Sequence, residues 1–192
     1  MILIDYFLDE DALKPLNDRQ LWIDCHGAFR WFDKSEPKNV WETFIENATK
    51  RLEIYDDVIG FEWWVVACVI NPDTFDPKEG VYSWHQDVDE TTDDLLPEWS
   101  CTYYGYPHSL WGGFSEYQVE ESRSEVERFA PFYNRLIFNE TPGRYHRVSR
   151  VWKGERYALA FAGWKEKPPL FKDNDMHRYE DIPKFKWIYD NA

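Results

Sequence analysis

The chain has 192 residues, a length typical of one domain. Its 22 Lys and Arg residues against 36 Asp and Glu residues give a formal net charge of −14, which argues against nucleic acid or a membrane as the main partner, because both attract cationic surfaces. Aromatic residues make up 19% of the chain and hydrophobic residues 43%. This composition excludes disorder and predicts a large aromatic core.

The cysteines and the first residues indicate the compartment. Cys25, Cys68 and Cys101 are widely separated and form no C-x-x-C pair, so neither a disulfide framework nor a zinc knuckle is predicted, and a reducing compartment is the simplest interpretation. The opening MILIDYFLDED lacks a basic region, and the longest apolar run, Trp63 to Ile70, is too short to cross a bilayer. We therefore expect a cytoplasmic protein without a membrane span.

The first third of the chain, residues 1–57, is predicted to be an N-terminal cap. A short strand is expected over residues 2–8. Ser35 as an N-cap and Pro37 in the first turn predict a helix over about 38–55. Apolar residues recur along it at helical spacing, at Trp41, Phe44, Ile45, Ala48 and Leu52.

From Val58 the sequence consists of short runs rich in Val, Tyr, Trp and Phe, separated by pairs of residues that favour turns. Many short strands after one helix predict a mainly β protein with flanking α, a double-stranded β-helix (jelly roll, cupin-like). We expect one domain over 1–192, with a catalytic core at 58–166 and a C-terminal tail or lid at 167–192. The strands are expected near 60–70, 99–106, 113–119, 134–139, 144–150 and 155–164.

His85 and Asp87 stand two apart in the sequence His-Gln-Asp. On an extended backbone this spacing directs an imidazole and a carboxylate to the same face, where both can bind one metal ion. The motif alone is a weak signal, because an H-x-D arises by chance in roughly half of such sequences. A surface histidine in an acidic loop is the competing interpretation.

Further residues downstream complete a longer pattern. Tyr82, His85 and Asp87 form Y-x-x-H-x-D, and after about sixty residues His146 follows a strand and a turn. Arg156 comes ten residues later, on the next expected strand. Between them lie the segments W-S-C-T-Y-Y (99–104), W-G-G-F-S (111–115) and N-R-L-I-F (134–138).

This pattern resembles the iron(II)- and 2-oxoglutarate-dependent dioxygenases, and within them it is most similar to the prolyl 4-hydroxylase-like branch. The resemblance covers about residues 58–165. It implies that His85, Asp87 and His146 bind Fe(II) and that Arg156 binds 2-oxoglutarate. It also implies O2 as a cosubstrate and ascorbate as a candidate reductant. The family usually has Glu-Leu after Gly-Gly, where this chain has Phe114-Ser115, and this departure puts the substrate side in doubt.

The residue chemistry agrees with the resemblance. Two imidazoles and one carboxylate on one face of an iron ion leave three coordination positions open. Arg156 offers a fork of donors that matches a carboxylate. Strand alternation places Arg156 with Ala158, Ala160 and Ala162, and the large Tyr157, Leu159 and Phe161 on the other face, toward the helix.

Several assignments have alternatives. Arg156 could instead belong to a solvated ladder of basic residues with Arg144, Arg147, Arg150 and Lys153. The resemblance makes Tyr82 and Tyr103 candidates for a hydroxyl contact to the cosubstrate. For Tyr103 core packing is an equal alternative, and Tyr104 would point the opposite way.

The expected activity is hydroxylation of an unactivated C–H coupled to decarboxylation of 2-oxoglutarate to succinate and CO2. A prolyl residue in a peptide or protein is the first candidate substrate, and a free amino acid or another small molecule is the second. The acidic run that follows Asp87, within residues 88–97, could act as a lid and meet a basic substrate. The remaining alternatives are a non-catalytic cupin-like binding module and a zinc hydrolase, and the sequence does not define an oligomeric state.

Overall fold

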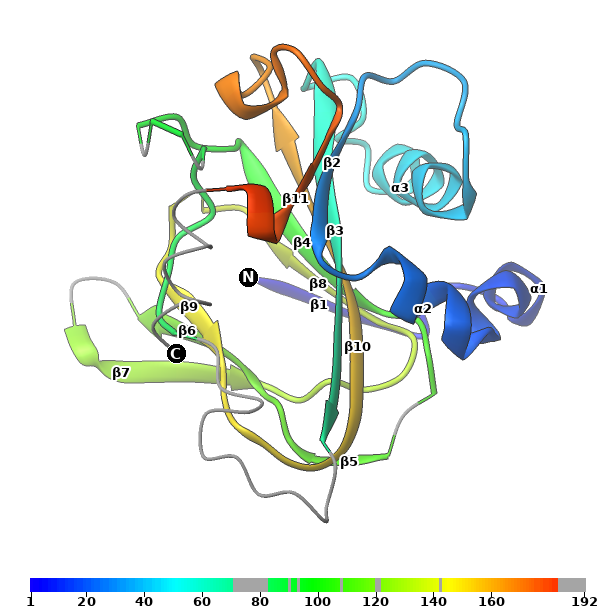
Figure 1. Cartoon of the computed structure of the whole chain (residues 1–192). Coiled ribbons are helices and arrows are strands. Elements are labelled where there is room, and N and C mark those ends of the chain that lie inside the picture. Colours follow the sequence, from blue (N-terminus) through cyan, green and yellow to red (C-terminus); the bar gives the residue numbers. More distant parts are fainter. Residues whose placement is uncertain are drawn as a thin grey trace.

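The computed structural model describes residues 1–70, 83–89, 91–92, 94–107, 109–119, 122–141 and 143–182. Two antiparallel sheets face each other, and the helices lie on the outer side of the larger sheet (Figure 1). This arrangement confirms the predicted mainly β jelly roll. No helix in this described part of the chain is long and apolar enough to span a bilayer.

The large sheet contains eight strands within the described residues, in the order β1-β8-β4-β10-β3-β2-β11, with β5 paired to β10. The long strand β10 lies between β3 and β4, and it pairs with β3 over residues 154–164 and with β4 over residues 159–163. The strands are β1 (Ile2–Asp5), β2 (Ala28–Phe32), β3 (Gly60–Ile70), β4 (Trp99–Tyr104), β5 (Leu110–Gly112), β8 (Arg135–Asn139), β10 (Val151–Trp164) and β11 (Met176–Arg178).

The small sheet has the order β7-β6-β9, formed by β6 (Ser115–Val119), β7 (Ser122–Phe129) and β9 (His146–Val148). Strand β7 was not predicted, because its charged sequence SRSEVERF lacks the apolar alternation that marks a half-buried strand. It lies at the edge of its sheet, where a charged strand is tolerated and discourages edge-to-edge pairing.

The main core lies between the large sheet and the helices α1 (Glu10–Leu13), α2 (Arg19–Cys25) and α3 (Val40–Arg51). The face of β10 that carries Tyr157, Leu159 and Phe161 is buried in this core, as the alternation predicted. Phe161 meets Phe44 of α3 edge to face, with ring centroids 6.1 Å apart. One face of β10 therefore supports the fold and leaves the other free for a site.

Helix α3 is shorter at both ends than the predicted 38–55. Its N-cap is Asn39, not Ser35, because the Asn39 side chain accepts hydrogen bonds from the backbone N–H groups of Trp41 and Glu42. At the other end Glu53 takes a positive φ of 60°, and the Glu53 N–H donates to the Lys50 carbonyl, which ends the helix.

The N-terminal segment does more than cap the barrel, since β1 pairs with β8 and β2 pairs with β3 in the large sheet. Asn134 links the chain after β1 to the core. Its side-chain oxygen accepts from the Leu8 N–H, and its side-chain nitrogen donates to the Leu8 carbonyl. The strand predicted over residues 2–8 therefore ends at Asp5, and the residues that follow are fixed by Asn134.

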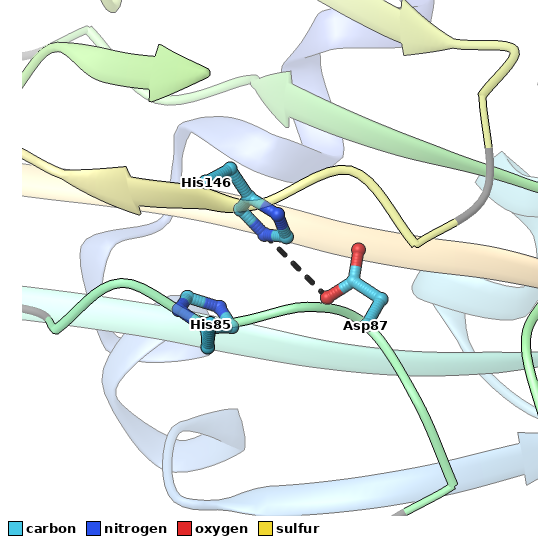
Figure 2. Close-up of side chains that lie close together, drawn as sticks. All are labelled: His85, Asp87 and His146. Atoms are coloured by element: carbon cyan, nitrogen blue, oxygen red, sulfur yellow. Dashed lines mark ion pairs between the residues drawn. The ribbon is translucent and has the colours of Figure 1, made fainter. Parts of the chain in front are cut away.

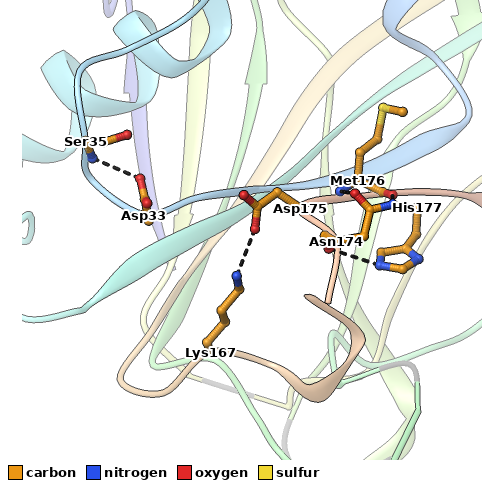
Figure 3. A network of polar contacts seen from close by, with 7 residues as sticks. All are labelled: Asp33, Ser35, Lys167, Asn174, Asp175, Met176 and His177. Atoms are coloured by element: carbon orange, nitrogen blue, oxygen red, sulfur yellow. Dashed lines mark hydrogen bonds and ion pairs between the residues drawn. The ribbon is translucent and has the colours of Figure 1, made fainter. Parts of the chain in front are cut away.

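The described part of the C-terminal segment, through residue 182, is docked on the barrel. Strand β11 pairs with β2, and the 3-10 helices η2 (Pro169–Phe171) and η3 (Tyr179–Asp181) flank it. Figure 3 shows the polar contacts that hold this segment, among them an ion pair of 2.8 Å between Lys167 and Asp175. Phe171 is fully buried and Ile182 is 2% exposed, so this part packs as core.

Candidate metal and 2-oxo acid site

His85, Asp87 and His146 lie together, with His146 at the start of β9 and His85 and Asp87 on the segment of residues 83–89 (Figure 2). One ligand atom from each lies within 4.8 Å of the others. The Asp87 carboxylate is 3.5 Å from Nε2 of His146. The structure thus brings together three residues that are up to 61 positions apart in the sequence (146 − 85 = 61).

Backbone pairing sets the relative position of the two histidines. The His85 N–H donates to the His146 carbonyl at 3.0 Å, and the His146 N–H donates to the His85 carbonyl at 2.8 Å. This antiparallel bridge directs both side chains to one face and leaves the ring centroids 4.3 Å apart. Asp87 lies two residues beyond His85 and therefore points to the same side.

The hydrogen bonds of the two imidazole rings are those typical of metal-binding histidines. Nδ1 of His85 lies 2.8 Å from the Ser83 carbonyl, and Nδ1 of His146 lies 2.9 Å from the Arg144 carbonyl. A carbonyl can only accept, so each Nδ1 carries a proton, and Nε2 is the nitrogen of each ring that can bind a metal ion. A backbone or carboxylate acceptor on the second ring nitrogen is the usual support of a metal-binding histidine. The donor set, two imidazole nitrogens and a carboxylate, is suited to non-haem Fe(II).

Tyr117 of β6 packs against the metal-facing side chains. Its ring stacks on His146 with centroids 5.3 Å apart and an interplanar angle of 22°. Burial raises the pKa of the Tyr117 hydroxyl, and the nearby Asp87 carboxylate adds to this effect, while a hydrogen bond to Thr102 opposes it. Tyr117 is therefore a neutral hydroxyl at physiological pH.

Arg156 of β10 is only 2% exposed and points inward. Its Nε donates to the Gly113 carbonyl at 3.2 Å, and a terminal nitrogen donates to the Tyr104 hydroxyl at 2.9 Å. Gly113 has a φ of +70°, and a Cβ on it would lie 3.1 Å from Cδ of Arg156. Glycine at this position therefore lets the 112–114 turn approach the arginine closely.

The buried guanidinium of Arg156 has no carboxylate partner among the ion pairs of the described residues, since its hydrogen bonds go to a neutral hydroxyl and a carbonyl. A buried charge without a counter-charge is costly, so the position favours an anionic ligand. The Tyr104 hydroxyl also lies 2.7 Å from the Ser115 hydroxyl. Arg156, Tyr104 and Ser115 are therefore linked in one chain of hydrogen bonds.

The two tyrosines at the end of β4 have opposite environments. The Tyr103 hydroxyl donates to Asn134 at 2.8 Å, and its ring stacks on Phe44 in the main core. Tyr103 therefore faces away from Arg156, and its neighbour Tyr104 takes the position by the guanidinium. The register pairs Tyr103 with Leu159, a core residue, so the structure agrees with the core-packing alternative for Tyr103, and Tyr104 is the tyrosine that lies by Arg156. Tyr82 lies outside the described residues.

The basic residues near Arg156 in the sequence are partly exposed, while Arg156 is buried, so it does not share a solvated ladder with them. Arg144 pairs with Glu127 at 2.7 Å, and the Arg150 guanidinium lies 4.7 Å from the Trp152 ring centroid. Ser115 was missed in the sequence, where the 114–115 pair was noted only as a departure from the family pattern.

The acidic run after Asp87 contains a structural carboxylate. Asp89 is 2% exposed, accepts from the N–H and hydroxyl groups of Thr91 and Thr92, and reaches the Leu170 N–H at 3.3 Å. Burial alone would raise the pKa of Asp89, but these hydrogen bonds outweigh it and lower the pKa. Asp89 therefore cannot meet a basic substrate, and Asp94 is the exposed acid of the run among the described residues.

The fold is similar to that of solved prolyl hydroxylases and of a 2OG-Fe(II) oxygenase family protein from Burkholderia pseudomallei. Comparison with solved structures finds a Pseudomonas putida prolyl-4-hydroxylase at a TM-score of 0.60 and 17% identity, covering 87% of each chain. A viral collagen prolyl hydroxylase of Paramecium Bursaria Chlorella virus-1, in complex with 2OG, gives 0.56 and 15%, covering 86% of this chain and 96% of the other.

A Trichoplax adhaerens prolyl hydroxylase, in complex with a hypoxia inducible factor peptide fragment, gives a TM-score of 0.54 and 14% identity, covering 90% of this chain and 87% of the other. These similarities confirm the expected likeness to the prolyl-hydroxylase-like fold. No protein-family model and no curated protein sequence matches the chain.

Proposed function

We propose that the chain is an Fe(II)- and 2-oxoglutarate-dependent dioxygenase that hydroxylates an unactivated C–H. His85, Asp87 and His146 would hold the iron, and Arg156 with Tyr104 would bind the distal carboxylate of 2-oxoglutarate. The observation that carries the proposal is the buried Arg156 with neutral partners, on the inner side of the same barrel as the triad. A zinc hydrolase with these three ligands would have no use for this arginine.

The side chains around the triad have separate tasks. Bound Fe(II) would supply the oxygen activation that couples decarboxylation of the 2-oxo acid to hydroxylation. Arg156 binds and orients the far end of the cosubstrate, and the Tyr104 hydroxyl fixes the plane of its guanidinium through the 2.9 Å hydrogen bond. Tyr117, 4% exposed, covers one face of the His146 ring and keeps water from it.

A prolyl residue in a peptide or protein is the proposed substrate. The support is the likeness to prolyl hydroxylases, one of which is in complex with a peptide fragment. A net charge of −14 suits a basic partner. A free amino acid or another small molecule is the second candidate within the same chemistry.

The test is anaerobic titration of the chain with Fe(II) and then 2-oxoglutarate. A dioxygenase gives a visible metal-to-ligand charge-transfer band when the 2-oxo acid binds, and it releases succinate when air is admitted. A binding module gives no succinate, and a zinc hydrolase gives neither signal. His85→Ala and His146→Ala should remove both metal retention and succinate release while the circular dichroism of the barrel stays unchanged, because each loses a ligand and neither residue belongs to the main core. Full turnover in either variant would exclude that residue from the site.

Substrate identity needs a separate experiment. Host peptides, proteins and metabolites are incubated with the enzyme, Fe(II) and 2-oxoglutarate, and mass spectrometry searches for a gain of one oxygen atom. Oxygen on a prolyl residue supports the first candidate, and oxygen only on a small molecule replaces it with the second.

A further inference from the structure

The segment of residues 83–89, which carries two of the three ligands, is anchored at its far end by Asp89, whose N–H donates to the Leu95 carbonyl, and has little backbone pairing near the ligands. Within the described residues it contains no regular strand, and its ladder contact is the single bridge between His85 and His146. Gln86 adds a side-chain hydrogen bond to the Gly143 carbonyl. A ligand pair held by one bridge can change its separation unless side chains also fix it.

A side-chain link exists on the outer face of the small sheet. Trp84 precedes His85, and Arg147 follows His146, so alternation directs both away from the metal-facing side. The Arg147 guanidinium lies 4.6 Å from the Trp84 ring centroid. This cation–π contact joins the two ligand-bearing segments directly behind their histidines.

Arg147 is itself held by a buried acid. Its Nε lies 2.7 Å from one carboxylate oxygen of Glu116, its partner in the β6–β9 ladder. Glu116 is 1% exposed, and its other oxygen lies 2.6 Å from Nε of Arg128. Because both carboxylate oxygens of Glu116 have a cationic partner, the side chain is held in place and fixes the Arg147 guanidinium.

Strand β6 therefore holds His146 from two sides. Tyr117 stacks on the His146 ring from the inside, and the preceding Glu116 fixes the following residue, Arg147, from the outside. The proposed dioxygenase chemistry does not use Glu116, Arg147 or Trp84. Their arrangement is explained if it determines the geometry of the ligand pair.

We infer that Arg147 is a positioning residue that, between Glu116 and Trp84, sets the spacing of His85 and His146 and so the metal affinity of the site. The inference rests on the proposed function only in that the triad binds a divalent metal. Loss of a group that orients a metal ligand typically weakens metal binding by about tenfold to a hundredfold. We expect a loss of this size when either contact of Arg147 is removed.

The experiment titrates the full chain with Co(II), whose visible absorption reports both binding and coordination geometry. Arg147→Met and Trp84→Leu should each weaken Co(II) binding by about tenfold or more and change the band shape. Arg147→Lys keeps the charge and the reach to Glu116 and should recover part of the affinity. The matched control is Arg128→Met, which removes the other partner of Glu116 without touching Trp84 and should bind Co(II) nearly as tightly as the parent chain.

The outcomes separate the inference from the function. Equal Co(II) affinity and spectrum in the parent, Arg147→Met and Trp84→Leu would overturn the inference and leave the proposed function intact. An equal loss in Arg128→Met would also overturn it, because the effect would then belong to the sheet as a whole. Co(II) binding that survives His85→Ala would instead contradict the metal site.

If Arg147→Met does not fold, Co(II) binding by Trp84→Phe and Trp84→Leu tests the inference. Tighter binding by Trp84→Phe, which keeps an aromatic ring, supports it, and equal binding by the two variants rejects it.

Discussion

The two faces of β10 have the same backbone pairing and opposite uses. On the outer face, Tyr157, Leu159 and Phe161 are fully buried in the main core. On the inner face, Arg156 is followed at alternate positions by alanines, which leave space beside the guanidinium. Stability and chemistry are therefore carried by alternate residues of a single strand, and substitutions on the two faces should be separable.

The charged neighbours Glu155 and Arg156 show the same contrast. Glu155 faces outward and makes two hydrogen bonds with the guanidinium of Arg19, at 2.8 and 2.9 Å, in a partly exposed pair. Arg156 faces inward, is buried, and has only neutral partners among the described residues. The outer charge is already compensated by the protein, whereas the inner charge is compensated when an anionic ligand binds.

The largest effect is expected on the outer face. Phe161→Ala removes a fully buried ring that contacts Phe44 and Trp99, and it should lower the free energy of unfolding by about 3–5 kcal/mol. Denaturant unfolding measures this change. Where the variant is folded, its Co(II) affinity should equal that of the parent, and a large loss of metal binding would show that the two faces are not independent.

On the inner face, Arg156→Lys keeps the charge and loses the fork. The affinity for 2-oxoglutarate should fall by about tenfold to a thousandfold, since charge-assisted hydrogen bonds are worth about 1.5–3 kcal/mol and the geometry adds to this. Isothermal titration with Co(II) already bound measures it, and metal affinity should be unchanged. The control is Arg150→Lys, a nearby basic residue outside the site. If the control loses cosubstrate affinity and Arg156→Lys does not, Arg150 is the residue that binds the 2-oxoglutarate carboxylate.

The sequence predicted these two faces because strand alternation is a local property. The period of two separates Arg156 from Tyr157 without any knowledge of neighbouring strands. The same rule paired His85 with Asp87. Bringing His146 to them needed the family resemblance, because no local rule connects residues 59 positions apart (146 − 87 = 59).

The sequence could not predict which neighbouring tyrosine faces the core, because that depends on strand register. It also could not predict which of two suitable residues is the N-cap of α3. Tyr103 and Tyr104 are equivalent by residue type, and only the pairing of Tyr103 with Leu159 shows which one faces the core. Ser35 and Asn39 are both good N-caps, and the structure uses Asn39. The charged strand β7 has no apolar face that would predict it, so the sequence predicted β6 but not its neighbour β7.

The neighbouring tyrosines allow a finer test of the same comparison. Tyr104→Phe removes the hydroxyl beside Arg156 and should weaken 2-oxoglutarate binding by about twofold to tenfold, the equivalent of one hydrogen bond of about 0.5–1.5 kcal/mol. Tyr103→Phe removes the bond to Asn134 and should lower the free energy of unfolding by about 1 kcal/mol without changing cosubstrate affinity. Titration and denaturant unfolding of both variants measure these effects. Reversed results would place Tyr103 in the site and Tyr104 in the core.

The smallest effect is expected at the outward charge, Glu155. Hydrogen bonds from Arg19 hold the pKa of this carboxyl below its ordinary value of 4.5, and this lowering outweighs the opposing effect of burial, with the Tyr157 hydroxyl as a further donor. Because the pKa is lower in the folded state than in the unfolded chain, the charged form stabilises the fold above pH 4.5, and the stabilisation disappears as the pH falls through the folded pKa.

Glu155→Gln should therefore lower the free energy of unfolding by less than about 1 kcal/mol at pH 7, since the pair is partly exposed and screened. Denaturant unfolding at a series of pH values should show the difference from the parent shrinking in acid, with 2-oxoglutarate affinity at pH 7 unchanged. A difference that grows in acid, or a loss of cosubstrate affinity, would mean that the outer charge acts on the inner site through the strand.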